Sequence, residues 1–509
     1  MEYSWFMILL SLCLCAAATN VFLILFSQSK SKKTKLSLPP GPPSLPIVGS
    51  IFLLKRLLTD FESLIRDLSY KYGPIISIRI GSSLSVFISS HSLAHQALIQ
   101  NGAAFSYRPG SVTPSCIFRN TNSDTGSSSG ARWRFLRRNL TSALLSPSRY
   151  KCFGRARISF LETVDSLLKY HVESGDPVPV VEPFRYAMFS LLLFMCFGEK
   201  LDEKAIKDIV EIEGNVVANY KRLSIFHSFP TFGKFIFRKH LIDIRRKQIS
   251  ALLPLIQSRR ERKEKIKQEN QDENIFAYID SLFDLKFKDE GGRDINDEEI
   301  VILICEVMDA GSDTVSTVFE WVMAHLVKDQ TIQEKLFSEI QQVVNSEEEI
   351  KEEDLQKMPY LKAVVLETLR LNPPSHFVLP RIVEEDVVLN GYLIPKKTIV
   401  NFTVAGMGRD PQVWKDPMEF KPERFLGEEG EVVDITGTRE IKMMPFSAGR
   451  RICPGLGLGT LHLEYFLANL IRNYKWVAVD GQDVDMSEKQ EFTWVMKTPL
   501  RAHVSQRAK

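Results

Sequence analysis

The chain has 509 residues, of which 44% are hydrophobic and 25% charged, a composition typical of a globular protein with a large core. This composition excludes a disordered, collagenous or disulfide-scaffold protein. The 65 Lys and Arg residues nearly balance the 62 Asp and Glu residues, for a formal net charge of +3, so we expect no nucleic-acid partner.

The first segment of the chain is apolar. Residues 5–26 carry no charged side chain and are long enough to cross a bilayer as one helix. A cleavable signal peptide is the alternative, but the run is longer than the usual secretory core and no basic residue precedes it. Several lysines follow the run, which favours a cytosolic location for the rest of the chain. We therefore predict a membrane anchor, a single N-terminal transmembrane helix, within residues 1–28.

A basic and proline-rich hinge is predicted over residues 29–50. The run Pro39-Pro-Gly-Pro-Pro43 favours extended, stiff polyproline geometry, with a disordered linker as the alternative. We see no internal repeat and no second composition break beyond the hinge. Residues 51–509 are therefore predicted to form one large domain.

The pattern within this domain is mainly α with a smaller β portion. Apolar residues recur at three- and four-residue spacing over 150–260, and 297–327 predicts one long helix. Runs within 75–88 and 387–402 predict short strands. The charged stretch 259–274 predicts a solvated helix end that leads into a loop.

The most informative segment is Phe446-Ser-Ala-Gly449-Arg-Arg451-Ile-Cys453-Pro-Gly455. A cysteine between glycines can lie in a tight turn, where backbone N–H groups point at its sulfur and Arg451 supplies positive charge. Both effects stabilise a thiolate, which is the form that ligates a metal. Without further pattern, a structural role for Cys453 would remain the alternative.

The full pattern F-x-x-G-x-R-x-C-x-G closely resembles the haem-binding signature of the cytochrome P450 family, the haem-thiolate monooxygenases. The resemblance implies the cytochrome P450 fold and haem b (iron protoporphyrin IX), with Cys453 as the axial iron ligand. It also implies that Arg451 contacts a haem propionate and that Phe446 packs beside the sulfur, while Gly449 and Gly455 are the glycines of the signature.

Glu367-Thr-Leu-Arg370 lies on a predicted helix, where the three-residue spacing places the carboxylate and the guanidinium on one face. An exposed ion pair of little energetic value is the alternative for such a motif. Together with Pro422-Glu-Arg424-Phe, the motif resembles the family's buried Glu-Arg-Arg triad. The resemblance implies a structural role for all three charged side chains.

The predicted long helix contains Ala310-Gly311-Ser-Asp313-Thr314. A glycine in mid-helix costs about 1 kcal/mol relative to alanine, and small residues at Ala310 and Gly311 would let a flat macrocycle lie against the helix. The segment resembles the family's oxygen-binding stretch, which implies that Thr314 and Asp313 help to deliver protons. A bond from the threonine to its own helix backbone is the alternative. Val315 occupies a position that often carries a second hydroxyl, which leaves the detailed proton route open.

Trp133 and Arg137 are one helical turn apart, and both side chains can donate hydrogen bonds to an anion. By resemblance to the family's W-x-x-x-R motif, they are implied to bind a haem propionate, as is Arg381. The preceding residues 121–130 carry no core-forming side chain, which predicts a flexible loop. They also depart from the plant pattern, so the sequence does not determine the conformation of this loop.

The resemblance extends to the plant microsomal branch of the family, through the proline-rich hinge and the segments Phe105–Pro109, Cys196–Gly198 and Pro422–Phe425. It implies an enzyme of the endoplasmic reticulum membrane whose catalytic domain is cytosolic. The enzyme would insert one oxygen atom of dioxygen into a small apolar organic substrate of plant specialised metabolism. Electrons would come from NADPH through a separate NADPH-cytochrome P450 reductase, with cytochrome b5 as a further partner.

Two other functions remain open on the sequence. The same fold could serve as a dioxygen-independent dehydratase or isomerase, although Thr314 and the uninterrupted Cys453 loop disfavour that function. A non-catalytic haem-binding membrane protein is the second alternative. The sequence predicts neither the substrate nor the position that is oxidised.

Overall fold

A computed structural model describes residues 36–44, 50, 53, 56, 60–80, 83–109, 130–224, 230–269, 276–345, 348–427, 433–479 and 483–507. The chain divides into two compact units, of which the first takes Met1–Tyr107 and Leu379–Thr403 and the second takes the remainder. The predicted membrane anchor at 1–28 lies outside the described residues. Across the described ranges, no helix has the length and apolar character needed to cross a bilayer.

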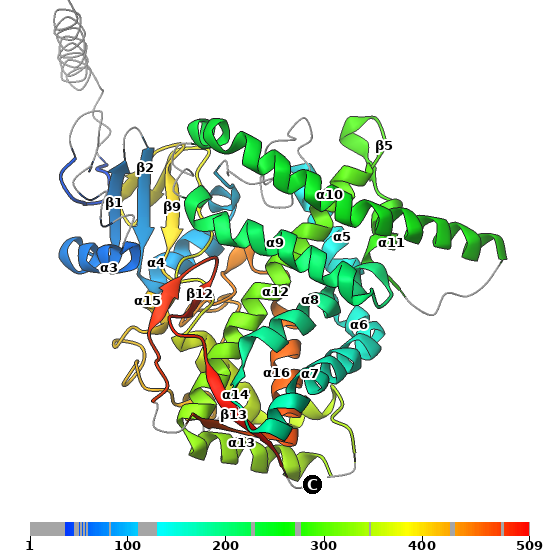
Figure 1. Ribbon diagram of the computed structural model, residues 1–509. Helices are drawn as coiled ribbons and strands as arrows, with labels where there is room; N and C mark the ends of the chain where they lie inside the picture. Colours follow the sequence, from blue (N-terminus) through cyan, green and yellow to red (C-terminus); the bar gives the residue numbers. More distant parts are fainter. Residues whose placement is uncertain are drawn as a thin grey trace, which may run out of the picture. The chain divides into compact units, whose positions relative to one another are not determined.

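The first unit is built on a four-stranded sheet of order β1-β2-β9-β6 (Figure 1). β1 (Ile75–Ile80) pairs antiparallel with β2 (Ser83–Ile88), and β2 runs parallel to β9 (Ile399–Phe402), which comes from a distant part of the sequence. The strands expected within 75–88 and 387–402 are therefore confirmed. The other elements of this unit are α3 (Phe61–Tyr72), α4 (His91–His95), the π-helix η2 (Gln96–Gln100), the 3-10 helix η3 (Ala104–Ser106), β6 (Arg381–Ile382), β7 (Val387–Leu389) and β8 (Tyr392–Ile394).

The second unit is mainly helical, as the sequence predicts. Its α-helices are α5 (Ala131–Ala143), α6 (Pro147–Tyr150), α7 (Gly154–Ser174), α8 (Val181–Phe197), α9 (Glu203–Ser224), α10 (Pro230–Glu269), α11 (Tyr278–Phe283), α12 (Asp297–Lys328), α13 (Gln330–Val343), α14 (Pro359–Leu371), α15 (Ala405–Gly408) and α16 (Leu456–Asn473). Its 3-10 helices are η5 (Lys151–Phe153), η7 (Lys288–Glu290), η8 (Asp354–Lys357), η9 (Pro422–Phe425) and η10 (Gly449–Arg451).

The strands of the second unit are short. β10 (Tyr474–Ala478), β13 (Arg501–Gln506) and β3 (Val178–Pro179) form one sheet in the order β10-β13-β3. β11 (Glu488–Gln490) pairs with β12 (Trp494–Met496), and β4 (Lys286–Phe287) pairs with β5 (Arg293–Asp294).

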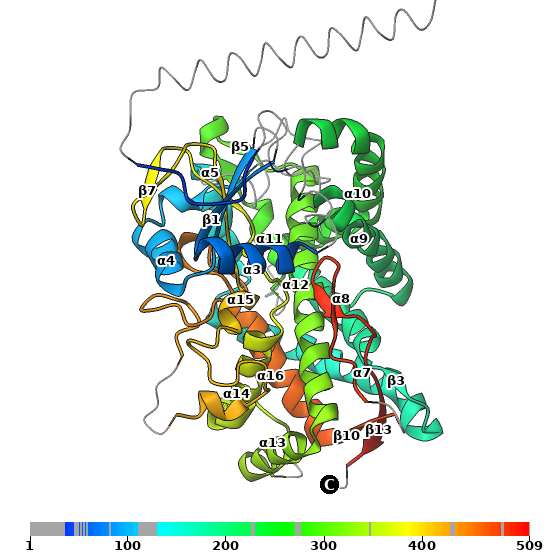
Figure 2. The ribbon, with the colours of Figure 1, turned by 90° about the vertical axis from the view of Figure 1, so that its left-hand side faces the viewer.

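The long helix expected at 297–327 is confirmed as α12, which runs through the second unit beside α8 and α16 (Figures 1 and 2). Its start is fixed by a capping box, in which Asn296 Oδ1 accepts from the Glu299 N–H and Glu299 Oε2 accepts from the Asn296 N–H, each at 2.9 Å. All of its residues from Ser316 to Val327 are buried, so this end of α12 is part of the core.

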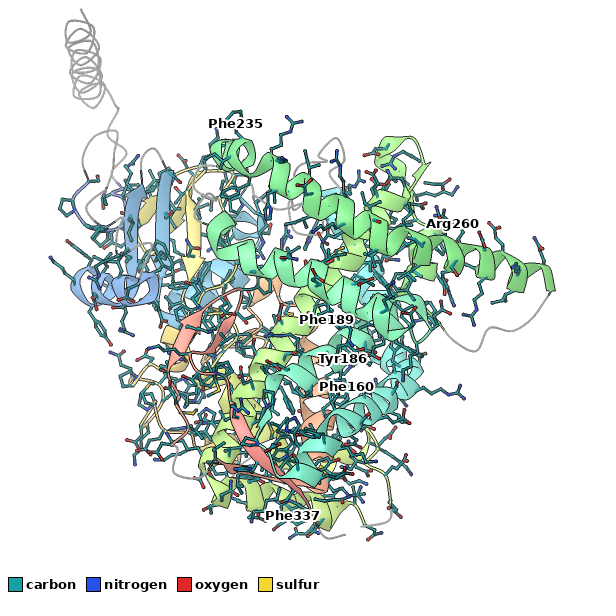
Figure 3. The ribbon with its side chains drawn as sticks, in the orientation of Figure 1. Phe160, Tyr186, Phe189, Phe235, Arg260 and Phe337 are labelled. Atoms are coloured by element: carbon teal, nitrogen blue, oxygen red, sulfur yellow. The ribbon has the colours of Figure 1, made fainter. Side chains whose placement is uncertain are left out.

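Phenylalanine rings from α7, α8, α12 and α16 pack against one another in the core. Phe160 of α7 stacks on Phe466 of α16 with ring centroids 3.7 Å apart, and Phe184 of α8 stacks on Phe319 of α12 at the same separation. Figure 3 shows Phe160 within the helices, whereas Phe235, which is 82% exposed, projects from the beginning of α10. Phe160 and Phe184 also contact each other edge to face at 5.0 Å, so these rings connect α7, α8, α12 and α16.

The prediction of a solvated helix end at 259–274 is wrong for its first residue. Arg259 is buried, and its guanidinium donates to both oxygens of Asp280 at 2.9 and 2.6 Å. The carboxylate of α11 therefore offsets the desolvation of this cation.

Candidate functional site

The Cys453 loop lies immediately before α16. Gly449 and Ser447 adopt positive φ values of 70° and 61°, a backbone conformation that glycine reaches without strain. The turn is closed by the Cys453 N–H, which donates to the Phe446 carbonyl at 2.8 Å. Gly455 is the N-cap of α16, so the cysteine lies close to the positive end of a helix.

The sulfur of Cys453 is in a mixed electrostatic environment. Burial raises the pKa of the Cys453 thiol, while a hydrogen bond from the Gly455 N–H and the charge of Arg137 act in the opposite direction. The sequence predicts that backbone N–H groups and the charge of Arg451 stabilise the sulfur. The structure supplies the N–H of Gly455, but the arginine whose charge acts on the sulfur is Arg137 of α5 and not Arg451, and burial still leaves the pKa of the thiol raised.

Arg137 and Trp133 reach the Cys453 loop from the same face of α5. Arg137 Nη2 donates to the Ile452 carbonyl at 2.5 Å. The guanidinium carbon of the buried Arg451 lies 3.9 Å from the centroid of the Trp133 ring, a cation–π contact. Trp133, Arg137, Arg451 and Cys453 are therefore brought together.

The middle of α12 presents an exposed small residue between buried ones. Ala310 is exposed although Met308 and Ser312 are buried, and Thr314 lies one turn further along the same face. The Thr314 hydroxyl donates to the Ala310 carbonyl at 2.7 Å, so in this structure it makes the local backbone bond that is the alternative to proton delivery.

Gly311 and Val315 face the packed side of α12. A Cβ atom at Gly311 would lie 3.0 Å from Leu192 Cδ1 of α8, so the glycine permits close packing of the two helices. Val315 packs against the hydrophobic core.

Asp313 is buried beside a cation from α8. Arg185 Nε lies 3.2 Å from Asp313 Oδ1 in an ion pair. Burial raises the pKa of Asp313, the charge of Arg185 opposes this rise, and Glu491 adds to it. The sequence analysis missed Arg185, because its pairing with Asp313 depends on how α8 packs on α12.

The Glu-Arg pair of α14 is fully buried and bidentate. Arg370 Nε and Nη2 donate to Glu367 Oε2 and Oε1 at 2.6 and 2.8 Å, and both side chains are 0% exposed. Arg424 Nε donates to Glu367 Oε1 at 3.2 Å. Arg370 Nη1 donates to the Gly408 and Pro417 carbonyls at 2.6 and 2.8 Å. The arrangement matches the triad that the sequence predicts and joins α14 to the segment before the Cys453 loop.

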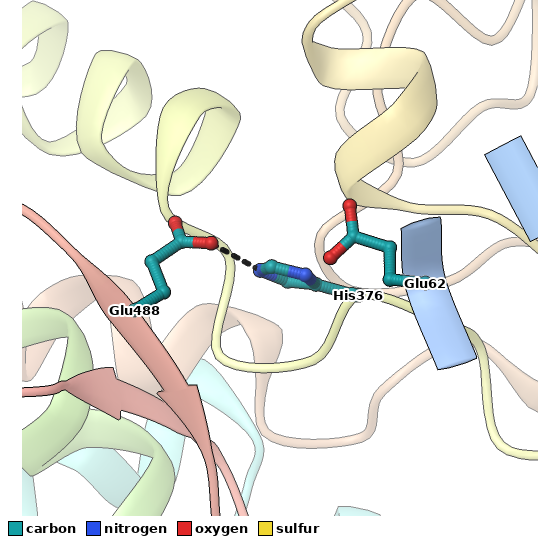
Figure 4. A group of neighbouring side chains, drawn as sticks. All are labelled: Glu62, His376 and Glu488. Atoms are coloured by element: carbon teal, nitrogen blue, oxygen red, sulfur yellow. Dashed lines mark ion pairs between the residues drawn. The ribbon is translucent and has the colours of Figure 1, made fainter. Parts of the chain in front are cut away.

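Within the second unit, the segment that begins at His376 contacts the hairpin formed by β11 and β12. The His376 ring stacks on Trp494 of β12 with centroids 3.7 Å apart, and its Nε2 lies 3.4 Å from Glu488 Oε2 of β11 (Figure 4). Thr493, in the β11–β12 turn, shares a 2.7 Å hydrogen bond with Thr317 of α12. Arg381 lies in β6 of the first unit, where it is buried and pairs with Val400.

A family model described as Cytochrome P450 matches residues 39–505 of the chain. The chain belongs to the cytochrome P450 family. It is a monooxygenase, an oxidoreductase, and its mainly helical fold with a smaller sheet portion is consistent with the cytochrome P450 fold.

Its curated relatives are plant cytochromes P450. Cytochrome P450 89A9 of Arabidopsis thaliana is 44% identical over 490 residues, which cover 93% of this chain and 94% of the relative. Geraniol 8-hydroxylase of Catharanthus roseus is 31% identical, with 92% and 93% covered, and germacrene A acid 8-beta-hydroxylase of Helianthus annuus is 31% identical, with 91% and 92% covered.

The family implies haem b, and the second unit of this cytochrome P450 offers groups that fit it. A partly buried thiol lies in a turn with an arginine beside it, and the side chains of Trp133, Arg137 and Arg451 gather around the same loop. The exposed Ala310 interrupts the buried surface of α12. Soft sulfur as the ligand and guanidinium groups as anion partners are the donor chemistry that an iron porphyrin with two propionates requires.

Proposed function

We propose that this cytochrome P450 is a haem-thiolate monooxygenase of the plant microsomal type, in which the sulfur of Cys453 would bind the iron. The observation that carries the proposal is the Cys453 turn, in which the Gly455 N–H and the Arg137 charge act on the sulfur. Haem b, when bound, supplies the activation of dioxygen. The protein residues supply binding, orientation and protons.

The proposed roles of the residues follow from their placement. Arg137, Arg451 and Trp133 would hold a haem propionate near the Cys453 loop. For Arg381, the same role is proposed on the resemblance to the family alone. Phe446, Gly449 and Gly455 would shape the loop around the sulfur. Ala310 would leave room for the macrocycle along α12, whereas Gly311, for which the sequence predicts the same role, packs against Leu192 of α8.

Asp313 and Thr314 would carry protons along α12. Asp313 holds its proton more tightly than an exposed carboxyl, since burial raises its pKa. The Thr314 hydroxyl, which donates to the Ala310 carbonyl, can turn and donate into the open side of the helix instead. With Val315 in the next position, the second hydroxyl of this route would have to come from water or from the substrate.

The substrate that we propose is a small apolar organic molecule. Support comes from two relatives whose names describe hydroxylases of geraniol and of germacrene A acid. The electrons would come from NADPH through NADPH-cytochrome P450 reductase, with cytochrome b5 as a second donor. An N-terminal anchor within 1–28 would hold the enzyme in the endoplasmic reticulum membrane with its catalytic domain in the cytosol.

The carbon monoxide difference spectrum of the reduced protein tests the ligand directly. A thiolate opposite carbon monoxide shifts the main haem band strongly to the red, so wild type should show this band and Cys453→Ser should lose it. Cys152→Ser, which removes an exposed thiol from η5, is the matched control and should keep the band. A folded, haem-loaded Cys453→Ser protein that retains the red-shifted band would refute the assignment.

A further inference from the structure

Two arginines and two glutamates form an ion-pair cluster at the start of α5. Arg132 of α5 is 7% exposed, and its Nη2 donates to Glu299 Oε1 of α12 at 2.8 Å. Its Nη1 donates to Glu290 Oε1 of η7 at 2.5 Å. Arg293 of β5 donates to the Glu299 carboxylate through Nη1 and Nη2, each at 2.9 Å, and to Glu290 Oε2 through Nε and Nη2, at 2.8 and 2.6 Å. These four side chains, the α5 clamp, join α5 to η7, β5 and the start of α12.

The α5 clamp also contacts an aromatic ring. Phe287 of β4 is buried, and the guanidinium carbons of Arg132 and Arg293 lie 3.8 and 5.1 Å from the centroid of its ring. Phe135 of α5 contacts the same ring edge to face, with centroids 6.1 Å apart. Arg132 is therefore held by two carboxylates and by the face of a ring, which restricts the orientation of its guanidinium.

Both carboxyl groups of the α5 clamp are ionised at neutral pH. Burial alone would raise the pKa of Glu299, but hydrogen bonds from Arg293 and Asn296 and the charges of both arginines lower it below its usual value. The hydrogen bond from Arg293 likewise lowers the pKa of Glu290. The clamp therefore contains two charges of each sign, and the burial of Glu299 strengthens their attraction.

The first turn of α5 is held by the clamp rather than by a cap. Gly130 is the N-cap residue and makes no side-chain hydrogen bond to the helix, whereas a capping side chain commonly fixes a helix start. Arg132 is the second residue of α5, and Glu299 is the third residue of α12. Their 2.8 Å ion pair therefore joins the first turns of the two helices.

The other face of α5 supports the Cys453 turn. Trp133 follows Arg132 directly, and Arg137 lies one turn after Trp133 on the same face. Arg137 Nη2 donates to the Ile452 carbonyl at 2.5 Å, and its charge acts on the Cys453 sulfur. One short helix thus carries the clamp residue on one face and two side chains of the cysteine turn on another.

We propose that Arg132 is a positioning residue of the haem site, which fixes α5 through the clamp so that Arg137 and Trp133 face the Cys453 turn. This inference rests on the proposed haem-thiolate function. A displacement of the first turn by about 1 Å would be carried along α5 to Arg137, and a hydrogen bond weakens once its donor and acceptor are more than about 3.2 Å apart.

The reduction potential of the full-length, haem-loaded protein tests this role. A cation beside the sulfur favours the reduced state, which carries one more negative charge, so a displaced Arg137 should make reduction less favourable. We expect Arg132→Gln to lower the equilibrium constant for one-electron reduction by about threefold or more, which is a shift of about 30 mV to a more negative potential. Loss of stability alone would reduce the yield of haem-loaded protein and leave the potential of the folded molecules unchanged.

A double-mutant cycle shows whether Arg132 acts through Arg137. Arg137→Gln should itself lower the potential, and Arg132→Gln should add little to that change in the Arg137→Gln protein. Arg134→Gln, which removes an exposed cation two residues after Arg132, is the matched control for the direct effect of charge. It should leave the potential unchanged.

Glu290→Gln tests the clamp from its other side. The Glu290 side chain is 37% exposed, so this variant should fold even where Arg132→Gln does not. The direct effect of losing an anion would raise the potential, whereas a loosened Arg132 should lower it. A fall in the potential of Glu290→Gln therefore identifies the route through α5.

The carbon monoxide band separates this inference from the proposed function. If wild type shows the red-shifted band, an unchanged potential in every clamp variant that folds would overturn the positioning role and leave the haem-thiolate function standing. An undiminished effect of Arg132→Gln in the Arg137→Gln protein would do the same. If folded, haem-loaded wild type lacks the band, both proposals are overturned.

Discussion

Arg185 of α8 and Asp313 of α12 form an ion pair in which Nε and Oδ1 are 3.2 Å apart. The aspartate is buried, whereas the arginine side chain is 37% exposed. Arg185 therefore connects a buried carboxyl group of the proposed proton route to the surface of the second unit.

Substitution of Arg185 should change the pH profile of the enzyme. Arg185→Gln removes the charge that holds down the pKa of Asp313, so that pKa should rise. We expect the acidic limb of the rate profile to move to higher pH by about one unit. This shift is at the lower end of the range for an adjacent opposite charge, because Arg185 is partly exposed to solvent. Product formation against pH, with saturating reductase, measures the limb. Arg155→Gln, at an exposed position of α7, is the control. An unmoved limb in Arg185→Gln would exclude this role of Arg185.

The buried triad should respond far more strongly to loss of charge than a surface pair does. Glu367→Gln leaves Arg370 and Arg424 without their anion, and we expect a loss of about 3–5 kcal/mol in unfolding free energy. Glu423→Gln breaks the exposed 2.7 Å pair with Lys335 and should cost less than about 1 kcal/mol. Denaturant unfolding followed through haem release compares the two variants. Equal losses would mean that the triad is not held by its charges.

Gly408 should not tolerate a methyl group. A Cβ at this position would lie 2.3 Å from the Arg370 carbonyl oxygen, so Gly408→Ala must displace α15 from α14. We expect a loss of about 2 kcal/mol or more, typical of an overpacked core. Gly214→Ala, in α9 where a Cβ meets nothing within 4 Å, should instead be neutral or stabilise by up to about 1 kcal/mol. The thermal unfolding midpoint should therefore be clearly lower than that of wild type in Gly408→Ala, and it should be unchanged or higher in Gly214→Ala.

His325 should make the second unit sensitive to acid. Burial lowers the pKa of His325 to about 4, although a 2.8 Å hydrogen bond to Asn372 Oδ1 opposes the shift. Its folded pKa is depressed, so its contribution to stability is complete above the unfolded pKa of about 6.5 and is lost as the pH falls toward about 4.

This linkage predicts a loss of about 2 kcal/mol from His325 between pH 7 and pH 5. The difference in unfolding free energy between these two pH values should be smaller in His325→Gln by that amount, whatever the variant's stability at pH 7. If the difference in unfolding free energy between pH 7 and pH 5 were as large in His325→Gln as in wild type, the pKa of His325 would not be lowered in the folded protein.

The sequence predicts local relationships well. Glu367 and Arg370 are three residues apart on one helix, so their pairing depends only on helix geometry, and α12 is marked by its length and acidic start. The Cys453 turn is likewise signalled by its glycines. Each of these features is encoded within about thirty consecutive residues.

Relationships between helices could not be predicted in the same way. Arg185 meets Asp313, and Arg259 meets Asp280, only because of how the helices pack. A charged residue has the same signature in sequence whether it is solvated or buried against a partner. The error at Arg259 has this cause.

The contact of Arg451 with Trp133 has a consequence for biosynthesis. Trp133 belongs to a helix that leaves the ribosome hundreds of residues before Arg451 and Cys453 do. Trp133 is therefore synthesised long before the residues of the Cys453 turn that it contacts. The turn can form only when translation is almost complete. Any chain truncated before Arg451 would leave the indole of Trp133 without its guanidinium partner.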